Sequence, residues 1–83
     1  MKPRKHPYGD KNISGANIER IRKEKGMKQH ELVSQMQTLG VDINPSSLSK
    51  LEGQMRTATD IELRAIAHIF KTSMDEIVPP IKD

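Results

Sequence analysis

The chain has 83 residues, no cysteine and a formal net charge of +3. Its length allows one small domain, and the absence of cysteine excludes a disulfide framework and a thiolate metal site. No apolar run approaches the roughly 20 residues of a membrane span, and the N-terminal residues lack the apolar core of a signal peptide. We therefore expect a cytoplasmic protein without a membrane segment.

The positive charge of the chain is concentrated at its N-terminus. Residues 1–12, which we predict to be a flexible arm, contain a single acidic residue, whereas residues 13–83 carry equal numbers of basic and acidic side chains. The basic side chains of the arm are Lys2, Arg4, Lys5 and Lys11. Such an arm is attracted to polyanions over a long range, so nucleic acid is one expected partner. The alternative is a solvated terminus that binds nothing.

Apolar residues recur at helical spacing along the rest of the chain, and no segment alternates like a β-strand. Helix-opening residues and helix-ending glycines divide this pattern into segments. The sequence therefore predicts an all-α domain over residues 13–78, followed by a short tail over 79–83. The five expected helices cover residues 14–25, 28–39, 45–53, 59–70 and 73–78.

Several expected helix ends carry recognisable caps. Ser14 stands at the start of the first helix. Two pairs, Thr59 with Glu62 and Ser73 with Glu76, have the spacing of capping boxes. The fourth helix is apolar around most of its circumference, which is typical of the central helix in a small bundle. We expect this helix to be buried on most sides.

The helix expected over residues 45–53 begins with Asn44 as its N-cap and Pro45 at its first position. Its residues divide into two rows at i, i+3, i+4 spacing. One row, formed by Leu48, Leu51 and Glu52, suits the protein interior. The opposite row consists of Ser46, Ser49 and Lys50. We expect this second row to face outward.

One charge lies within an apolar row on each of two helices. Arg22 shares a row with Ile18 and Ile21 on the first expected helix, and Glu52 shares one with the leucines of the third. A buried charge is costly unless it is paired and hydrogen-bonded. We therefore predict an Arg22–Glu52 ion pair between these helices. The alternative is that both side chains are solvated at helix ends.

The polar row of the third helix has the chemistry of a DNA-reading surface. Serine hydroxyls can bind phosphates or base edges, and Lys50 can reach O6 or N7 of guanine in the major groove. Asn44 and the first-turn amides form an end that attracts anions. Tyr8 and Phe70 are the only aromatic residues, too few to stack single-stranded bases, so a duplex is the expected ligand. The same row would also suit an ordinary solvated face.

Five motifs follow one another along the chain: IERIRKEKG (18–26), KQHEL (28–32), SSLSKLEGQMR (46–56), DIELRAIAHIF (60–70) and SMDEIV (73–78). Together they resemble the helix-turn-helix domains of the phage repressor and Cro-type (XRE-like) family. The resemblance covers residues 15–78 and implies a compact five-helix, lambda-repressor-like domain. In this family the second and third helices form the DNA-binding unit, and the third enters the major groove.

The resemblance also implies roles for individual residues. Arg22 and Glu52 occupy the positions of the family's buried ion pair, and Gln29 matches a glutamine that contacts the DNA backbone. Arg56 belongs to a loop that contacts phosphate or the dimer partner. The predicted DNA-binding residues are Gln29, Asn44, Pro45, Ser46, Ser47, Ser49, Lys50 and Arg56, with Lys2, Arg4 and Lys5 from the arm.

Three features depart from the family pattern. The segment QTLGVDI (37–43) adds residues between Gln29 and the third helix, so we expect a longer second helix and a different turn. Val33 occupies a position that is usually alanine, where helices pack closely. Pro45 stands where a polar reader is common, and its side chain cannot form hydrogen bonds.

These observations predict a sequence-specific, double-stranded DNA-binding transcriptional regulator that acts as a repressor. The family resemblance implies a homodimer, with Met55, Met74 and Ile77 as candidate dimer contacts. The alternative is a protein-interaction module of the same fold, such as a toxin-neutralising antitoxin that binds DNA mainly with its protein partner. No metal-ligand spacing, phosphate-binding loop or catalytic set is recognisable, so we expect no metal, no cofactor and no enzymatic activity.

Overall fold

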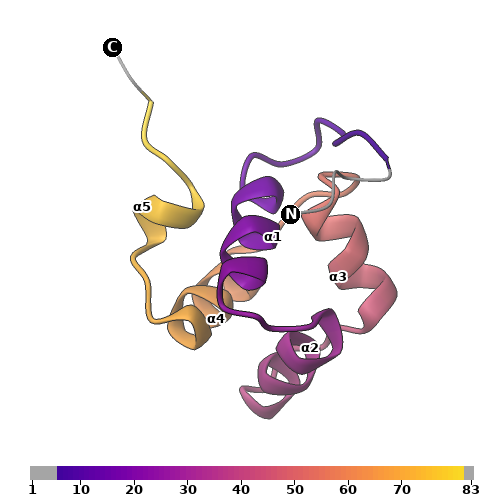
Figure 1. Cartoon of the computed structure of the whole chain (residues 1–83), viewed down its shortest axis with the longest axis vertical. Helices are drawn as coiled ribbons and strands as arrows, with labels where there is room; N and C mark the ends of the chain where they lie inside the picture. The colour runs from indigo at the N-terminus through magenta and orange to yellow at the C-terminus, as the bar shows by residue number, and fades with distance from the viewer. Residues whose placement is uncertain (1–5, 82–83) are drawn as a thin grey trace.

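The computed structural model describes residues 6–81 and contains only helices as regular structure within this range. The helices are α1 (Gly15–Glu24), α2 (Gln29–Thr38), α3 (Pro45–Glu52), α4 (Asp60–Phe70) and α5 (Met74–Ile77) (Figure 1). Every predicted helix boundary lies within one residue of the observed one, so the all-α prediction is confirmed. None of these helices in residues 6–81 has the length and apolar character needed to cross a membrane.

The helices pack around one apolar core. α1 lies between α3 and α5 and contacts both, while α2 packs against α3 and α4 (Figure 1). α4 also contacts α1 and α5. The largest fully buried apolar side chains are Ile18, Leu32, Met36, Leu48, Leu51, Ile66, Phe70 and Ile77.

One side of α4 is more exposed than the sequence suggested. Ala65, Ile66 and Phe70 are buried, but Ile61 has 57% of its surface exposed. The expectation of a helix buried on most sides was therefore wrong near its N-terminus. The physical reason is that α5 has only four residues and leaves part of the α4 surface uncovered.

Four helices end in Schellman motifs, which pair the last carbonyl groups with N–H groups beyond the helix. In α1 and α2 the left-handed residue is a glycine, Gly26 or Gly40, as predicted. At the end of α3, Gly53 has an ordinary φ of −79°, and Gln54 adopts the left-handed conformation at φ 59°. Lys71 does so at the end of α4, with φ 55°.

We expect Lys71→Gly to stabilise the protein by about 0.5–1 kcal/mol, because glycine adopts a left-handed φ without the Cβ clash. Urea unfolding followed by circular dichroism measures this change. Lys71→Ala removes the same charge but keeps the Cβ, so it should give no comparable gain. Equal stabilisation by both substitutions would attribute the effect to charge and not to the backbone.

The connection between α2 and α3 is packed into the core. The segment 37–43 is divided between α2, which reaches Thr38, and a loop over 39–44. Val41 and Ile43 of this loop are buried, and the Gln37 side-chain amide donates to the Ile43 carbonyl at 2.9 Å. The loop therefore holds the start of α3 against α2.

The start of α1 is capped by a residue that the sequence analysis assigned to the arm. Ser14 is the N-cap residue, as predicted, but its side chain makes no capping hydrogen bond. Instead, the side-chain Oδ1 atom of Asn12 accepts hydrogen bonds from the N–H groups of Ser14 and Gly15 at 3.1 and 2.8 Å.

Of the two predicted capping boxes, only one forms. At α4 the Thr59 hydroxyl accepts from the Glu62 N–H, and the Glu62 carboxylate accepts from the Thr59 N–H, both at 3.1 Å. At α5 the Ser73 side chain makes no capping bond. The Glu76 carboxylate accepts a hydrogen bond from the Thr72 hydroxyl instead, which diverts it from the box.

Candidate nucleic-acid interface

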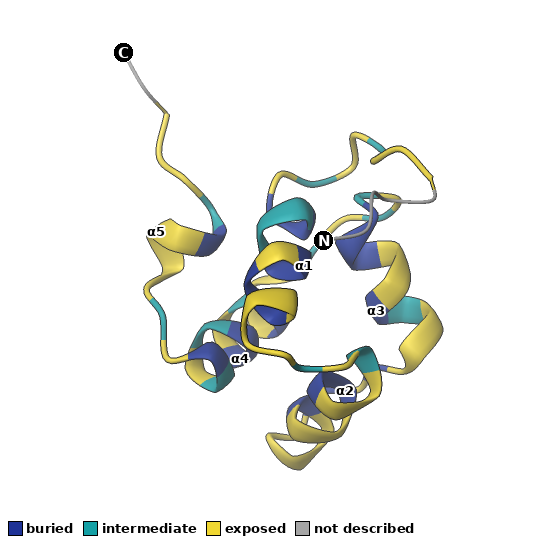
Figure 2. Ribbon diagram, viewed as in Figure 1, coloured by how far each residue is buried: buried dark blue, intermediate teal, exposed yellow. Residues whose placement is uncertain are grey.

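The two faces of α3 separate as the sequence predicted. Leu48, Leu51 and Glu52 are fully buried, whereas the opposite row is exposed along the whole helix (Figure 2). The exposed row consists of Ser46, Ser49 and Lys50. Small side chains cover little of the backbone, so another molecule could approach this face of α3 closely. Lys50 supplies its only charge.

A buried ion pair fixes the inner face of α3 to α1. Arg22 Nε lies 2.7 Å from Glu52 Oε2, and Arg22 Nη2 lies 3.0 Å from Glu52 Oε1. Both side chains are almost completely buried. The Arg22 Nη1 atom donates to the Met27 carbonyl at 2.8 Å, so the charge is hydrogen-bonded on two sides. The predicted Arg22–Glu52 pair is therefore present.

Gln29 joins this ion pair to the start of α2. Its side-chain Nε2 atom donates to Glu52 Oε1 at 2.8 Å, and the residue is partly buried. Gln29 was predicted to contact the DNA backbone, and in the structure its side-chain amide N–H donates to a carboxylate inside the protein. The geometry gives Gln29 a positioning role, linking α2, α3 and α1 at one carboxylate.

The N-terminus of α3 offers fewer free amides than the sequence suggested. The Asn44 side-chain oxygen accepts the Ser47 N–H at 2.8 Å, which confirms Asn44 as the N-cap. Pro45 has no N–H group. Of the amides at positions 45–47, only that of Ser46 remains for an external anion. The predicted anion-binding end is correspondingly small.

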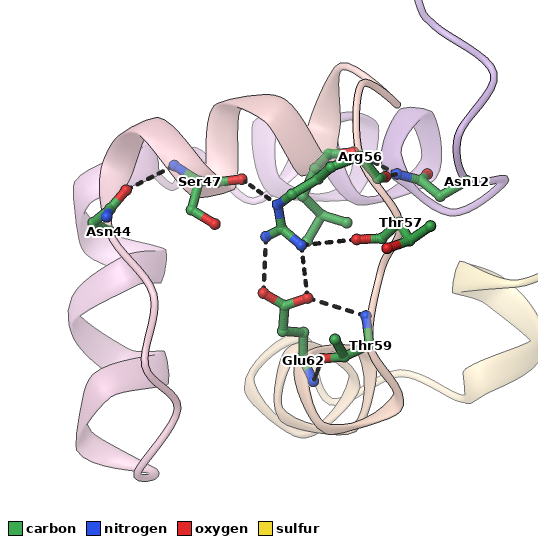
Figure 3. A network of polar contacts seen from close by, with 8 residues as sticks. Asn12, Asn44, Ser47, Arg56, Thr57, Thr59 and Glu62 are labelled. Carbon is green, nitrogen blue, oxygen red and sulfur yellow. Dashed lines mark hydrogen bonds and ion pairs between the residues drawn. The ribbon is translucent and has the colours of Figure 1, made fainter.

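The guanidinium group of Arg56 is hydrogen-bonded to other groups of the protein (Figure 3). Its Nη1 and Nη2 atoms contact the Glu62 carboxylate at 2.9 and 2.8 Å, and its Nε atom donates to the Ser47 carbonyl at 3.0 Å. Nη1 also donates to the Thr57 carbonyl at 2.9 Å. Within the protein the Arg56 guanidinium clamps the first half of α3 to the start of α4, and its contact with DNA stays a prediction.

The environment of Glu62 makes this clamp sensitive to acid. Burial alone would raise the pKa of Glu62, but hydrogen bonds from Arg56 and Thr59 and the Arg56 charge outweigh burial and hold the pKa below 4.5. The stabilisation is therefore complete above the pKa of the unfolded state and is lost as pH falls through the lower folded-state pKa.

We expect Glu62→Gln to lower stability at pH 7 by about 1–2 kcal/mol and to flatten the loss of stability below pH ~4.5, because a charged hydrogen-bond acceptor is removed. Urea unfolding at a series of pH values measures both effects. Glu31→Gln is the control, since Glu31 likewise accepts the N–H of the N-cap residue of its helix, Lys28 of α2, but has no arginine partner among residues 6–81. An unchanged pH slope in Glu62→Gln would exclude this carboxylate as the acid-sensitive group.

Residues 8–12, which we call the N-terminal strap, belong to the folded domain. The Gly9 N–H donates to the Gly53 carbonyl at 2.8 Å, and the Lys11 N–H donates to the Gln54 carbonyl at 2.9 Å. The Gln54 side-chain amide returns a hydrogen bond to the Asn12 carbonyl. Residues 8–12 of the arm predicted over 1–12 are therefore bound to the turn after α3, and for them the prediction of a flexible arm was wrong.

Asn12 is the main anchor of the strap. Besides capping α1, its side-chain Nδ2 atom donates to the carbonyls of Leu51 and Arg56 at 3.1 and 2.8 Å. One side chain thus joins the start of α1, the end of α3 and the following loop. The backbones meet closely here: a Cβ on Gly15 would lie 2.2 Å from the Leu51 carbonyl oxygen. Sequence reasoning missed Asn12, although an asparagine side chain commonly accepts the backbone N–H two residues further on, which here is that of the N-cap residue Ser14.

The strap brings the N-terminal part of the chain beside the exposed row of α3. His6 and Pro7 line a shallow hollow together with Ser49, Lys50 and Met55. The predicted DNA-binding residues Lys2, Arg4 and Lys5 lie outside the described residues. The first described residue after them, His6, lies beside Lys50.

The three predicted dimer contacts differ in exposure. Met55 is 61% exposed and Met74 is 40% exposed, so both are accessible. Ile77 is fully buried in the core, and its assignment as a dimer contact was wrong. Its side chain is covered because α5 packs against both α1 and α4. In the part of the chain that the structure describes, no group of three or more His, Asp or Glu side chains is arranged to hold a metal ion.

No family model, curated protein or solved structure matches this chain.

Proposed function

We propose that the protein is a sequence-specific, double-stranded DNA-binding transcriptional regulator that acts as a repressor. In this proposal α2 and α3 form a helix-turn-helix of the phage repressor and Cro type, and α3 enters the major groove. The observation that carries the proposal is the division of α3. Its inner face is locked by leucines and a buried ion pair, while its outer face exposes only two serines and a lysine between its ends.

Each exposed side chain has a role that suits its chemistry. Lys50 donates to O6 or N7 of guanine, and Ser46 donates to a base edge near the start of the helix. Ser49 and the partly buried Ser47 bind backbone phosphates, which set the register of α3 but carry no sequence information. Asn44 and Pro45 shape the entry of the chain into α3.

The basic arm would extend the same surface. Because the strap leaves His6 and Pro7 beside Ser49 and Lys50, the arm starts at the edge of the α3 row. Lys2, Arg4 and Lys5 can then reach phosphates or the minor groove near the base pairs contacted by Lys50. Their contribution would be electrostatic and would fall as salt concentration rises.

A homodimer would supply the affinity that one short helix lacks. A single recognition helix reads only a few base pairs, and dimers of this type place two helices about one DNA turn, roughly 34 Å, apart. The expected operator is therefore an inverted repeat. Selection of bound duplexes from a random pool at near-physiological salt, followed by sequencing, tests this directly. Failure of the folded protein to enrich any duplex would overturn the proposal.

We expect Lys50→Ala to weaken binding to the selected duplex by about 1–3 kcal/mol and to relax the preference at one base pair, because a bidentate guanine contact is lost. Fluorescence anisotropy on the selected duplex and on its single-base variants measures both effects. Lys23→Ala removes the same charge from an exposed site on α1 and should leave the base preference unchanged. Equal weakening on specific and random duplexes would make Lys50 a phosphate contact.

The second candidate is a protein-interaction module of the same fold, such as an antitoxin that binds DNA mainly with its toxin partner. Exposed apolar side chains favour it, namely Met55, Ile61, Met74 and Ile81. This module would bind DNA weakly when alone. Salt-dependent retention of the isolated protein on a DNA column separates the two candidates, since only the regulator is retained without a partner.

A further inference from the structure

An apolar groove runs between the end of α2 and the side of α4. It is lined by Leu39, Val41, Ile61, Arg64 and His68. Leu39 is 47% exposed, and Ile61 is more exposed still, although both are large apolar residues. A second hollow continues from the groove past Leu39 and His68 to Lys71. We call these two hollows together the α2–α4 groove.

The charged residues of the α2–α4 groove are basic. Arg64 and Lys71 carry positive charge, His68 lies between them along α4, and no acidic residue is among the lining residues of either hollow. All three side chains belong to exposed residues. An occupant of this groove should therefore combine apolar side chains with negative charge.

The surface next to the groove carries acidic side chains. Met74 of α5 and Asp60 line a third hollow with Ile61 and Arg64. Asp75 follows Met74 and is exposed, whereas the Glu76 carboxylate accepts a hydrogen bond from Thr72 and lines a separate hollow. Ile81 is 94% exposed. The segment 74–81 thus offers an exposed carboxylate, that of Asp75, together with exposed apolar side chains, which is the chemistry that the groove should accept.

We propose that the α2–α4 groove is the docking site for the 74–81 segment of a second copy of this chain. A two-fold interface requires one surface patch that complements itself, with each site and its ligand on the same face. Here the hollow formed by Ile61, Arg64 and Met74 connects the groove to the segment. In the proposed dimer the two-fold axis passes through this hollow, and Asp75 of each copy pairs with Arg64 of the other. The segment of each copy then covers Leu39 and Ile61 of the other copy.

This inference deepens the proposed function, because it names the surface by which the DNA-binding homodimer forms. In this dimer the buried Ile77 makes no contact with the second copy, and Met55 lies outside the interface, beside the α3 row. The association requires no DNA, so it is tested independently of the operator.

The decisive experiment exchanges charges across the interface. Arg64→Glu and Asp75→Lys are prepared separately, and sedimentation equilibrium without DNA gives the dimer dissociation constant of each variant and of their equimolar mixture. In each single variant both contacts of the dimer join like charges, so we expect dissociation constants raised roughly tenfold or more. In the mixed dimer both contacts again join opposite charges, so association should return to near the wild-type value.

The controls separate this interface from folding and from net charge. Circular dichroism melting checks that both variants fold, which we expect because the two side chains are exposed. Lys28→Glu makes the same charge change as Arg64→Glu just before the start of α2, at the opposite end of this helix from the groove, and should leave dimerisation unchanged. A wild-type monomer at high micromolar concentration, insensitivity to both substitutions, or failure of the mixture to recover would each overturn the proposal. If the protein fails this test but still selects an inverted repeat, it binds DNA as proposed and dimerises through a different contact.

Discussion

Replacing Glu52 with alanine should destabilise the protein by about 3–5 kcal/mol, the largest effect that we expect of any single substitution. The loss of one partner leaves Arg22 as an uncompensated charge in the core, and it also removes the acceptor of the Gln29 amide. Because small domains have only about 5–15 kcal/mol of stability in total, the variant would be close to unfolding at physiological temperature. Thermal and urea unfolding measure the change.

Two further variants distinguish the buried pair from charge in general. Glu52→Gln keeps the shape and part of the hydrogen bonding, so it should fold where the alanine variant does not and should still lose stability. Glu24→Ala breaks the exposed Arg20–Glu24 pair, whose N···O distance is also short at 2.8 Å, and should change stability by only about 0.5 kcal/mol. Similar losses at positions 24 and 52 would contradict the assignment of Glu52 as the buried anchor.

Asn12→Ala should cost about 2–4 kcal/mol, although residue 12 lies outside every helix. The substitution removes the cap of α1 and leaves the carbonyls of Leu51 and Arg56 without their side-chain donor. It should also release the N-terminal strap from the turn after α3. Urea unfolding measures the stability, and amide hydrogen exchange at Gly9 and Lys11 reports on the strap.

Asn44→Ala is the matched control for this prediction. Asn44 is also an asparagine helix cap, but within residues 6–81 its side chain makes a single hydrogen bond, from the Ser47 N–H. It should therefore cost about 1 kcal/mol, the usual value for one cap, and leave the strap protected. If Asn12→Ala loses no more stability than Asn44→Ala, Asn12 acts only as a helix cap and does not anchor the strap.

Together these contacts determine how α3 is presented. Glu52 holds its inner face, Asn12 holds its last turn through Leu51, and Arg56 holds its first half through the Ser47 carbonyl. The outer row carries none of these contacts. Under the proposed function, this division leaves the serines and Lys50 free to bind DNA while the helix itself is fixed from three directions.

The helices, the two faces of α3 and the Arg22–Glu52 pair could all be predicted from the order of the residues. These features depend on local spacing: residues three and four apart share a helix face, glycines favour the left-handed helix end, and a charge in an apolar row requires a partner. They could therefore be worked out from neighbouring residues alone. The same reasoning placed Lys50 and the serines on the outside, where the structure has them.

Which polar side chains remain available depends on tertiary contacts. Arg56 and Gln29 have the sequence character of DNA contacts, but Glu62 of α4 engages the first and Glu52 of α3 the second. Asn12 has the character of an arm residue, but it binds the end of α3 and the loop after it, 39 and 44 positions away. Burial of Ile77 and exposure of Ile61 likewise depend on where the short α5 packs. The reason is physical: a hydrogen-bond partner or a covering helix is set by the approach of segments far apart in the chain, and spacing along one helix contains no information about that approach.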